Sequence, residues 1–280
     1  MNKPRPVNST RVTALLTLLQ DDDVKIASLA MEQLLDLGHE TDEAIAEHQE
    51  SQDPQLRQRI HQLSSILLRR RRREDFLRAL GEGSLTLWRG LVAINVLSDP
   101  SVNVDFIDRE TEALAKAIAG GEPSAAQVAK LMKDRELRVP SEEILDMDLY
   151  LLDRVLEEGY GSAARLCAIA QQAAGENWPA TIVMRNGRFC LLDAEHTLVE
   201  PTEGWRLTKL NADERVHPCS IKDSLLAVLT QLFLVSLVDG SLRELYHFGS
   251  LLAALNRTGL DALPYPLGKE DNPQIRIGER

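Results

Sequence analysis

The sequence predicts an α+β fold that is mostly helical and carries a small antiparallel sheet. Leucine-rich segments with a helical period fill much of residues 9–174, and two more follow between residues 221 and 255. Three short apolar runs lie between them, and Asn186-Gly187 separates the first two. Asn-Gly between two apolar runs is the strongest short hairpin signal, because a type I′ turn needs positive φ at both central residues.

Residues 1–8 are expected to form a disordered leader, and residues 9–75 a HEAT-like helical module. Four short amphipathic helices are predicted to begin near Ser9, after Asp23, near Thr41 and after Asp53-Pro54. Asp suits a helix cap, Pro suits a first helical turn, and a Gly such as Gly38 suits the position after a helix end. An ordinary helical bundle predicts the same helices, so both interpretations stay open.

Five consecutive arginines follow the fourth helix: Arg69, Arg70, Arg71, Arg72 and Arg73. Five successive positions cover all sides of a helix, so part of the run must face solvent. One interpretation is a docking patch for an acidic protein or a nucleic acid. The favoured interpretation is a charged helix between two modules, with Glu74 and Asp75 nearby as ion-pair partners.

Residues 76–258 are expected to form the second domain, and residues 259–280 an irregular tail. Helices in this domain are predicted over residues 85–96, 104–118, from 123 onward, 149–157, 162–174, 221–238 and 242–255. Strands are predicted over residues 180–185, 188–192 and 197–201. The segment after Pro201 is interpreted as a polar turn.

Three motifs in the second domain carry a family resemblance. Residues 151–156 read Leu-Leu-Asp-Arg-Val-Leu, residues 186–189 read Asn-Gly-Arg-Phe, and residues 200–204 read Glu-Pro-Thr-Glu-Gly. Their order and spacing resemble the SirB-like branch of the transglutaminase-like superfamily, which has Tyr-Leu-x-x-Val-Leu, Pro-Gly-His-Phe and Asp-Pro-Phe-x-Gly at these places. The resemblance extends roughly from Gly83 to Asn256.

Transglutaminase-like enzymes use a Cys thiolate, a His and an Asp. The resemblance places the nucleophile near Ala163 to Arg165, the His at Arg188 and the Asp at Glu200. An arginine stays protonated and cannot act as a general base, so the resemblance implies a scaffold whose chemistry is lost or relocated. Arg165, Arg188 and Glu200 are then expected to project toward the former cleft. There a guanidinium either pairs with Glu200, which is favoured, or binds a carboxylate or a partner's C-terminus.

A relocated catalytic pair would use Cys167 or Cys190 with His196. Cys167 lies in the helix that follows Gly161, and a thiol near a helix N-terminus has a depressed pKa. Its apolar neighbours favour a buried, inert thiol instead. Cys190 lies on the second predicted strand, and His196 follows six residues later. A surface-loop histidine is favoured over a rearranged Cys–His pair.

Composition excludes several other function classes. The net charge of −11 argues against broad nucleic-acid binding, which needs a positive field. Three scattered cysteines are too few for a disulfide framework, and the first residues lack the apolar core of a signal peptide. The apolar run 225–238 is judged too short and too polar to span a membrane. These features predict a cytoplasmic protein.

No cofactor or metal is expected from the sequence. It holds no phosphate-binding loop, no dinucleotide fingerprint and no zinc-protease motif. The His217-Pro218-Cys219 segment is a weak metal signal, since structural zinc takes four ligands, and it is interpreted as a loop.

The leading hypothesis for function is therefore a non-catalytic protein-interaction or scaffolding module with a protein partner. It rests on the substituted catalytic positions and on the helical-repeat module, because stacked helical hairpins offer a groove for partners. The alternative is a cysteine-dependent acyl transferase or hydrolase.

Overall fold

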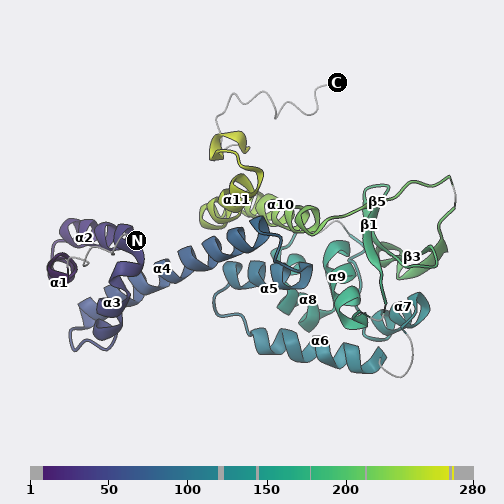
Figure 1. Cartoon of the computed structure of the whole chain (residues 1–280), viewed down its shortest axis with the longest axis horizontal. Coiled ribbons are helices and arrows are strands. Elements are labelled where there is room, and N and C mark those ends of the chain that lie inside the picture. Colours follow the sequence, from purple (N-terminus) through teal and green to yellow (C-terminus); the bar gives the residue numbers. More distant parts are fainter. Residues whose placement is uncertain are drawn as a thin grey trace, which may run out of the picture. The chain divides into compact units, whose positions relative to one another are not determined.

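The computed structural model describes residues 9–118, 123–142, 145–176, 178–211, 213–264 and 267. Within them the chain is mostly helical (65%) with a five-stranded antiparallel sheet, which confirms the predicted α+β class. The chain divides into two compact units, Met1–Asp75 and Phe76–Arg280 (Figure 1). The expected leader, residues 1–8, lies outside the described residues, and so does the expected tail apart from residues 259–264 and 267.

Unit 1 is built from helices of the predicted order. Its elements are α1 (Ser9–Leu18), α2 (Val24–Leu37), the 3-10 turn η1 (Gly38–Thr41), α3 (Asp42–His48) and the first part of α4 (Pro54–Gly81). The Asp23 carboxylate caps α2, and Gly38 ends it with φ +58°. Leucine and isoleucine side chains from these helices form one buried core, which includes Leu19, Leu34 and Ile60.

Helix α4 is longer than the sequence pattern indicates, because it continues through the arginine run to Gly81. Its N-terminal end is set by Asp53, whose carboxylate accepts the Gln55 amide at 2.9 Å. Arg59 on α4 donates to the carbonyl of Asp21 at 2.8 Å and to that of Leu19, which ties the α1–α2 turn to α4.

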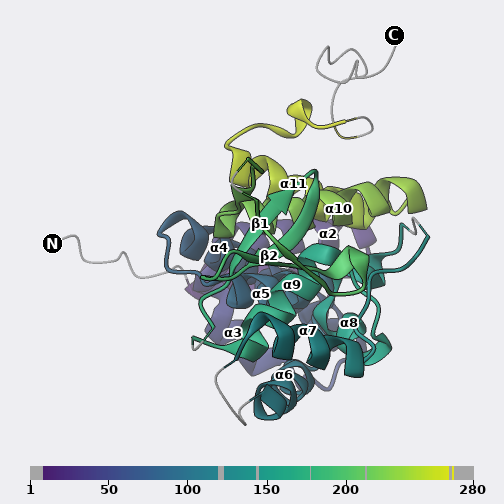
Figure 2. The same cartoon turned by 90° about the vertical axis from the view of Figure 1, so that its right-hand side faces the viewer.

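The helices of unit 2 surround α9. They are α5 (Leu87–Ser98), α6 (Val104–Ile118), α7 (Ala125–Asp134), the 3-10 turn η2 (Met147–Tyr150), α8 (Leu152–Glu158), α9 (Ala163–Ala174), α10 (Ile221–Asp239), α11 (Leu242–Asn256) and the 3-10 turn η4 (Leu260–Ala262). Helix α9 contacts β2 on one side and α5 and α6 on the other, and Figure 2 shows it behind the sheet.

The predicted helix over residues 149–157 is divided at Leu151 into η2 and α8. A tertiary hydrogen bond explains the division. The Leu152 amide donates to Oδ1 of Asn95 on α5 instead of to a helical carbonyl. A single sequence cannot reveal such a partner, because Asn95 lies more than fifty residues away along the chain.

Among the described residues the sheet has the order β4-β3-β2-β1-β5, and neighbouring strands are antiparallel. Its strands are β1 (Thr181–Arg185), β2 (Arg188–Leu192), β3 (Thr197–Glu200), β4 (Arg206–Lys209) and β5 (His217–Pro218). The first three were predicted, and Asn186 and Gly187 between β1 and β2 have φ +50° and +77°, as the hairpin requires. The predicted polar turn at Glu203-Gly204-Trp205 is found, since the 3-10 turn η3 (Pro201–Glu203) is followed by Gly204 with φ +62°. Strand β4, which follows this turn, was not predicted, and β5 corrects the predicted loop at His217-Pro218-Cys219. Both strands carry too few apolar residues to show a strand pattern.

The predicted alternation of β2 is also found. Phe189 and Leu191 join the main core on the α9 side of the sheet, whereas Cys190 and Leu192 join a small separate cluster with Val183. The two faces of the sheet therefore have different chemistry. One face is continuous with the helical core, and the other carries charged side chains around a few apolar ones.

Helix α10 is long and apolar enough to cross a membrane by length and composition alone, which corrects the judgement that this run is too short and too polar. Core helices of soluble proteins share this length and composition. Leu225, Leu229 and Leu232 of α10 are fully buried, and the helix packs along α11 in the core of unit 2.

Candidate functional site

A cavity of about 400 Å³ opens at the N-terminal end of α9, where the resemblance places the nucleophile. Its walls are the first turn of α9, the β1–β2 hairpin and the middle of α10. Its lining residues are all uncharged: Tyr150, Ser162, Ala163, Ala164, Met184, Gly187, Phe189, Ala227, Val228, Thr230 and Gln231. Among the described residues the cavity therefore offers no thiol, imidazole or carboxylate for acid–base or thiol chemistry.

Local sequence fixes this end of α9. Ser162 caps the helix, since its hydroxyl accepts the Arg165 amide at 3.4 Å. Gly161 lets the chain pass close to α8, because an added Cβ would lie 2.6 Å from Cγ1 of Val155. The helix start is well defined, but it presents alanines where a nucleophile would stand.

Arg165 does not project into this cavity as expected, because its side chain is fully buried. Its Nε donates to the Tyr150 carbonyl. Nη1 and Nη2 are buried and have no hydrogen-bond partner among the described residues. Burial lowers the pKa of the Arg165 guanidinium to about 9, and the nearby Asp153 carboxylate acts in the opposite direction.

Asp153 is held in place by a polar contact between helices. Asn95 on α5 donates through its side-chain amide to Asp153, and it accepts the Leu152 amide. Asn95 is 1% exposed, so this pair of hydrogen bonds lies in the core of unit 2. The arrangement positions a negative charge near Arg165, but no direct ion pair forms between them within the described residues.

Glu200 lies on the opposite side of the sheet from α9, away from Arg165. It is buried and pairs with Arg185 at 2.9 Å and with Arg206 at 3.3 Å, and it accepts the Thr208 hydroxyl at 2.8 Å. Arg185 also donates to Glu214 at 2.6 Å, and this bond holds the pKa of Glu214 below its ordinary value. Glu200 is thus part of a structural ion-pair network.

Arg188 is exposed and pairs with Glu203 at 2.6 Å, not with Glu200. The structure therefore does not bring Arg165, Arg188 and Glu200 together. Arg165 lies in the helical core, Glu200 in the outer network and Arg188 at the surface. The favoured pairing of Arg165 or Arg188 with Glu200 is not found, because the partners of Glu200 are Arg185 and Arg206.

The three thiols have the features of structural cysteines. Cys167 and Cys190 are buried and Cys219 is partly buried. Desolvation raises the pKa of all three thiols, that of Cys190 to about 11. A thiol with a raised pKa is a poor nucleophile at neutral pH, because the reactive species is the thiolate.

His196 lies in the turn before β3 and is exposed, with φ +61°. Its backbone amide donates to Asp193 and its carbonyl accepts from Leu210, so the main chain of His196 holds the turn. No hydrogen bond joins its ring to Cys190, whose thiol lies 3.8 Å from the Arg188 carbonyl. The structure shows no Cys–His pair at this place within the described residues.

The arginine run lies on α4, and Arg70 and Arg71 in it contact the preceding helices of unit 1. Arg71 pairs with Asp42 on α3, and Arg70 donates to the Leu35 carbonyl at 3.0 Å. Asp42, rather than a neighbour on the same helix, is the acidic partner seen for Arg71. These bonds use part of the run to attach α4 to the preceding helices.

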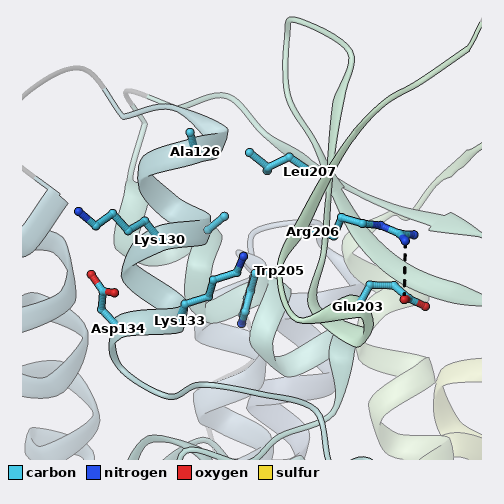
Figure 3. Close-up of a pocket in the computed structure, with 9 residues that line it drawn as sticks. Ala126, Lys130, Lys133, Asp134, Glu203, Trp205, Arg206 and Leu207 are labelled. Atoms are coloured by element: carbon cyan, nitrogen blue, oxygen red, sulfur yellow. Dashed lines mark ion pairs between the residues drawn. The ribbon is translucent and has the colours of Figure 1, made fainter.

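A second concave site lies between α7 and β4, with a volume of about 640 Å³ (Figure 3). Trp205 forms its base. The indole is 1% exposed and its Nε1 donates to the Leu137 carbonyl. Figure 3 shows Lys133 extending from α7 toward Trp205, with Arg206 on the other side paired to Glu203. Sequence reasoning missed this site because strand β4 was not predicted.

A metal site is not indicated by the part of the chain that the structure describes, where no three His, Cys, Asp or Glu side chains gather. His217 and Cys219 contact one another through the His217 carbonyl, in the short strand β5 and the residue after it.

No family model matches this chain, and no significant match was found among the curated proteins or the solved structures.

Proposed function

We propose that this protein is a non-catalytic protein-interaction or scaffolding protein, in which unit 2 is a degenerate transglutaminase-like domain and unit 1 a HEAT-like helical module. The observation that carries the proposal is the uncharged cavity at the start of α9. A thiol enzyme with this arrangement would need a nucleophile in that helical turn and a base beside it. The turn carries Ala163 and Ala164 instead.

Two further features support this proposal. The thiols are buried or partly buried with raised pKa values, and the charged residues at the other former catalytic positions belong to ion pairs. Both features stabilise a fold and neither supplies a catalytic group. The helical hairpins of unit 1 provide the kind of surface that repeat modules use to hold partners.

The first experiment measures the alkylation rate of each cysteine between pH 6 and 10 on the native protein, read by mass spectrometry. With a pKa of about 11, only about a thousandth of Cys190 is thiolate at pH 8. All three thiols should therefore react more slowly than a free peptide thiol. A thiol that reacts faster than the peptide at pH 7, and slows in His196→Ala, would replace this proposal with acyl chemistry.

The binding part of the proposal has its own test. A random peptide display library is selected against the whole immobilised chain. We expect the selection to yield peptides that bind in solution with a saturable isotherm. These peptides should bind equally to a variant with all three cysteines changed to serine. Failure to enrich any peptide over an unrelated acidic protein of similar size would count against the interaction role.

A further inference from the structure

Strand β4 forms one edge of the sheet among the described residues. Its pairing with β3 sets which backbone groups are free. The Leu210 amide donates to the His196 carbonyl, so His196 and Leu210 form a hydrogen-bonded pair at the end of the β3–β4 ladder. Along an antiparallel ladder, opposed residues alternate between hydrogen-bonded and non-hydrogen-bonded pairs. Arg206 and Thr208 therefore direct their backbone groups to β3, while Leu207 and Lys209 direct theirs to the open edge.

The groove beside this edge runs along the length of β4. The site in Figure 3 lies at the Arg206 end, and a neighbouring cavity of about 390 Å³ lies at the Lys209 end. Ala126 and Leu207 line both cavities, so the two adjoin one another. Leu207 is 41% exposed and lines both cavities, so it places an apolar side chain in the middle of the groove.

The groove has a rigid floor. Trp205 is fixed by its hydrogen bond to Leu137, and it has φ +61° directly before β4. Helix α7 is anchored by a capping box at Ser124 and Gln127 and packs against β3 and β4. The wall and the floor are thus formed before any ligand binds, which lowers the entropy cost of binding.

The Trp205 end of the groove favours an acidic ligand, because three basic residues (Lys130, Lys133 and Arg206) and two acidic ones (Asp134 and Glu203) line it, whereas Lys209 faces two acidic residues, Asp193 and Glu195, at the other end. Lys133 reaches toward Trp205 and has no ion-pair or hydrogen-bond partner among the described residues. The acids on the sheet side are already engaged: Glu203 pairs with Arg188, and Glu195 pairs with Lys209. Asp134 lies further out on α7 in Figure 3. An unpaired cation therefore faces the groove next to an unpaired strand edge.

We infer that the β4 edge and the α7 groove bind an extended acidic peptide segment of a protein partner, which adds to the sheet as a further strand. This inference deepens the proposed function by assigning it a surface and a class of ligand. The outward amides and carbonyls of Leu207 and Lys209 supply main-chain hydrogen bonds, and Lys133, which has no ion-pair partner among the described residues, supplies charge complementarity. A second copy of β4 would bring further basic residues, Arg206 and Lys209, to the same place, so an acidic segment fits better.

The test uses fluorescence polarisation with the whole chain and three synthetic eight-residue peptides. One alternates valine and glutamate, one alternates valine and lysine, and one is the glutamate peptide with alternate backbone amides methylated. The glutamate peptide should bind, and the other two should not. Methylation removes only the main-chain donors, so it separates strand addition from simple charge attraction.

Protein variants locate the site. Lys133→Glu should weaken binding of the glutamate peptide at least about tenfold, because it puts a like charge beside the acidic ligand. Lys222→Glu makes the same charge change at an exposed position on α10 and should leave binding unchanged. Both lysines are exposed, so neither variant threatens the fold.

Three outcomes overturn the inference: no binding of the glutamate peptide, equal binding of its methylated form, or equal binding to Lys133→Glu. If peptides selected by display still bind at another surface, the proposed protein-interaction function is retained and only the β4 edge is excluded as its site. A single-stranded oligonucleotide that binds in place of the peptide and loses affinity in Lys133→Glu would identify a nucleic-acid site and also overturn the inference.

Discussion

Replacing Arg165 by methionine should stabilise unit 2, because the native guanidinium is buried without enough partners. The side chain is fully buried, and one of its three nitrogens, Nε, has a hydrogen bond. Methionine keeps most of the apolar volume and places no charge in the core. Replacing buried charged groups by apolar ones of similar volume is often neutral or stabilising.

The structure gives the size of the effect. Burial lowers the pKa of Arg165 to about 9, roughly 3 to 4 below its ordinary value, and a difference of one in pKa corresponds to about 1.36 kcal/mol. The buried charge thus costs the fold about 5 kcal/mol. The lost hydrogen bond from Nε to the Tyr150 carbonyl is worth about 2 kcal/mol. Arg165→Met should therefore raise the free energy of unfolding by up to about 3 kcal/mol.

Urea unfolding at pH 7, followed by tryptophan fluorescence, measures this change. The three tryptophans, Trp88, Trp178 and Trp205, all belong to unit 2, so the signal reports that unit. A shift of the midpoint at constant slope gives the change in stability. Arg165→Ala is the matched control. It removes the same charge but opens a cavity that costs about 2–5 kcal/mol, so its free energy of unfolding should be lower than that of Arg165→Met.

The pH dependence has a defined sign. The folded state lowers the pKa of Arg165, so between about pH 9 and 12.5 the unfolded state binds more protons, and wild-type stability rises with pH. The advantage of Arg165→Met should be full below about pH 9 and smaller at pH 10. If Arg165→Met is less stable than wild type by more than about 1 kcal/mol at pH 7, the guanidinium is well satisfied and the reasoning is refuted.

Two further predictions concern the sheet and the start of α9. Glu200→Gln should destabilise unit 2 by about 2–4 kcal/mol in the same urea assay, because it removes a buried charge that Arg185 faces. Glu203→Gln, at a more exposed pair, should cost under about 1 kcal/mol, and equal costs would contradict the network. Gly161→Ala should cost about 1–3 kcal/mol, since its Cβ would overlap Val155. As a control, Gly81→Ala adds a Cβ that meets no atom within 4 Å, so it should leave the stability nearly unchanged. If Gly161→Ala also leaves the stability unchanged, α8 and α9 can move apart freely.

Helix positions and the hairpin could be predicted because each carries a local signal. The caps at Asp23 and Ser162 and the Asn186-Gly187 turn depend on residues a few positions apart. Strand β4 could not be predicted, because Leu207 is its one apolar residue and its place is decided by pairing with β3. The groove beside β4 was missed for the same reason.

The candidate cleft was predicted in part. The turn at the start of α9 and the β1–β2 hairpin do border one cavity, as the motif order indicates. The neighbours of individual side chains were not predictable. Arg188 and Glu200 share the outer face of the sheet, yet Arg188 pairs with Glu203 and Glu200 pairs with Arg185 and Arg206, a choice that depends on the assembled sheet.

Helix α4 carries residues of both hydrophobic cores, with Ile60 and Leu63 in one and Phe76 in the other. A helix segment of 12–15 residues is marginal in water without tertiary packing. If one core unfolds, the part of α4 that packs in that core loses its tertiary contacts, while the other part of α4 keeps them. A chain cut at residue 75 would divide this helix, and each part would lose the helical turns that continue it.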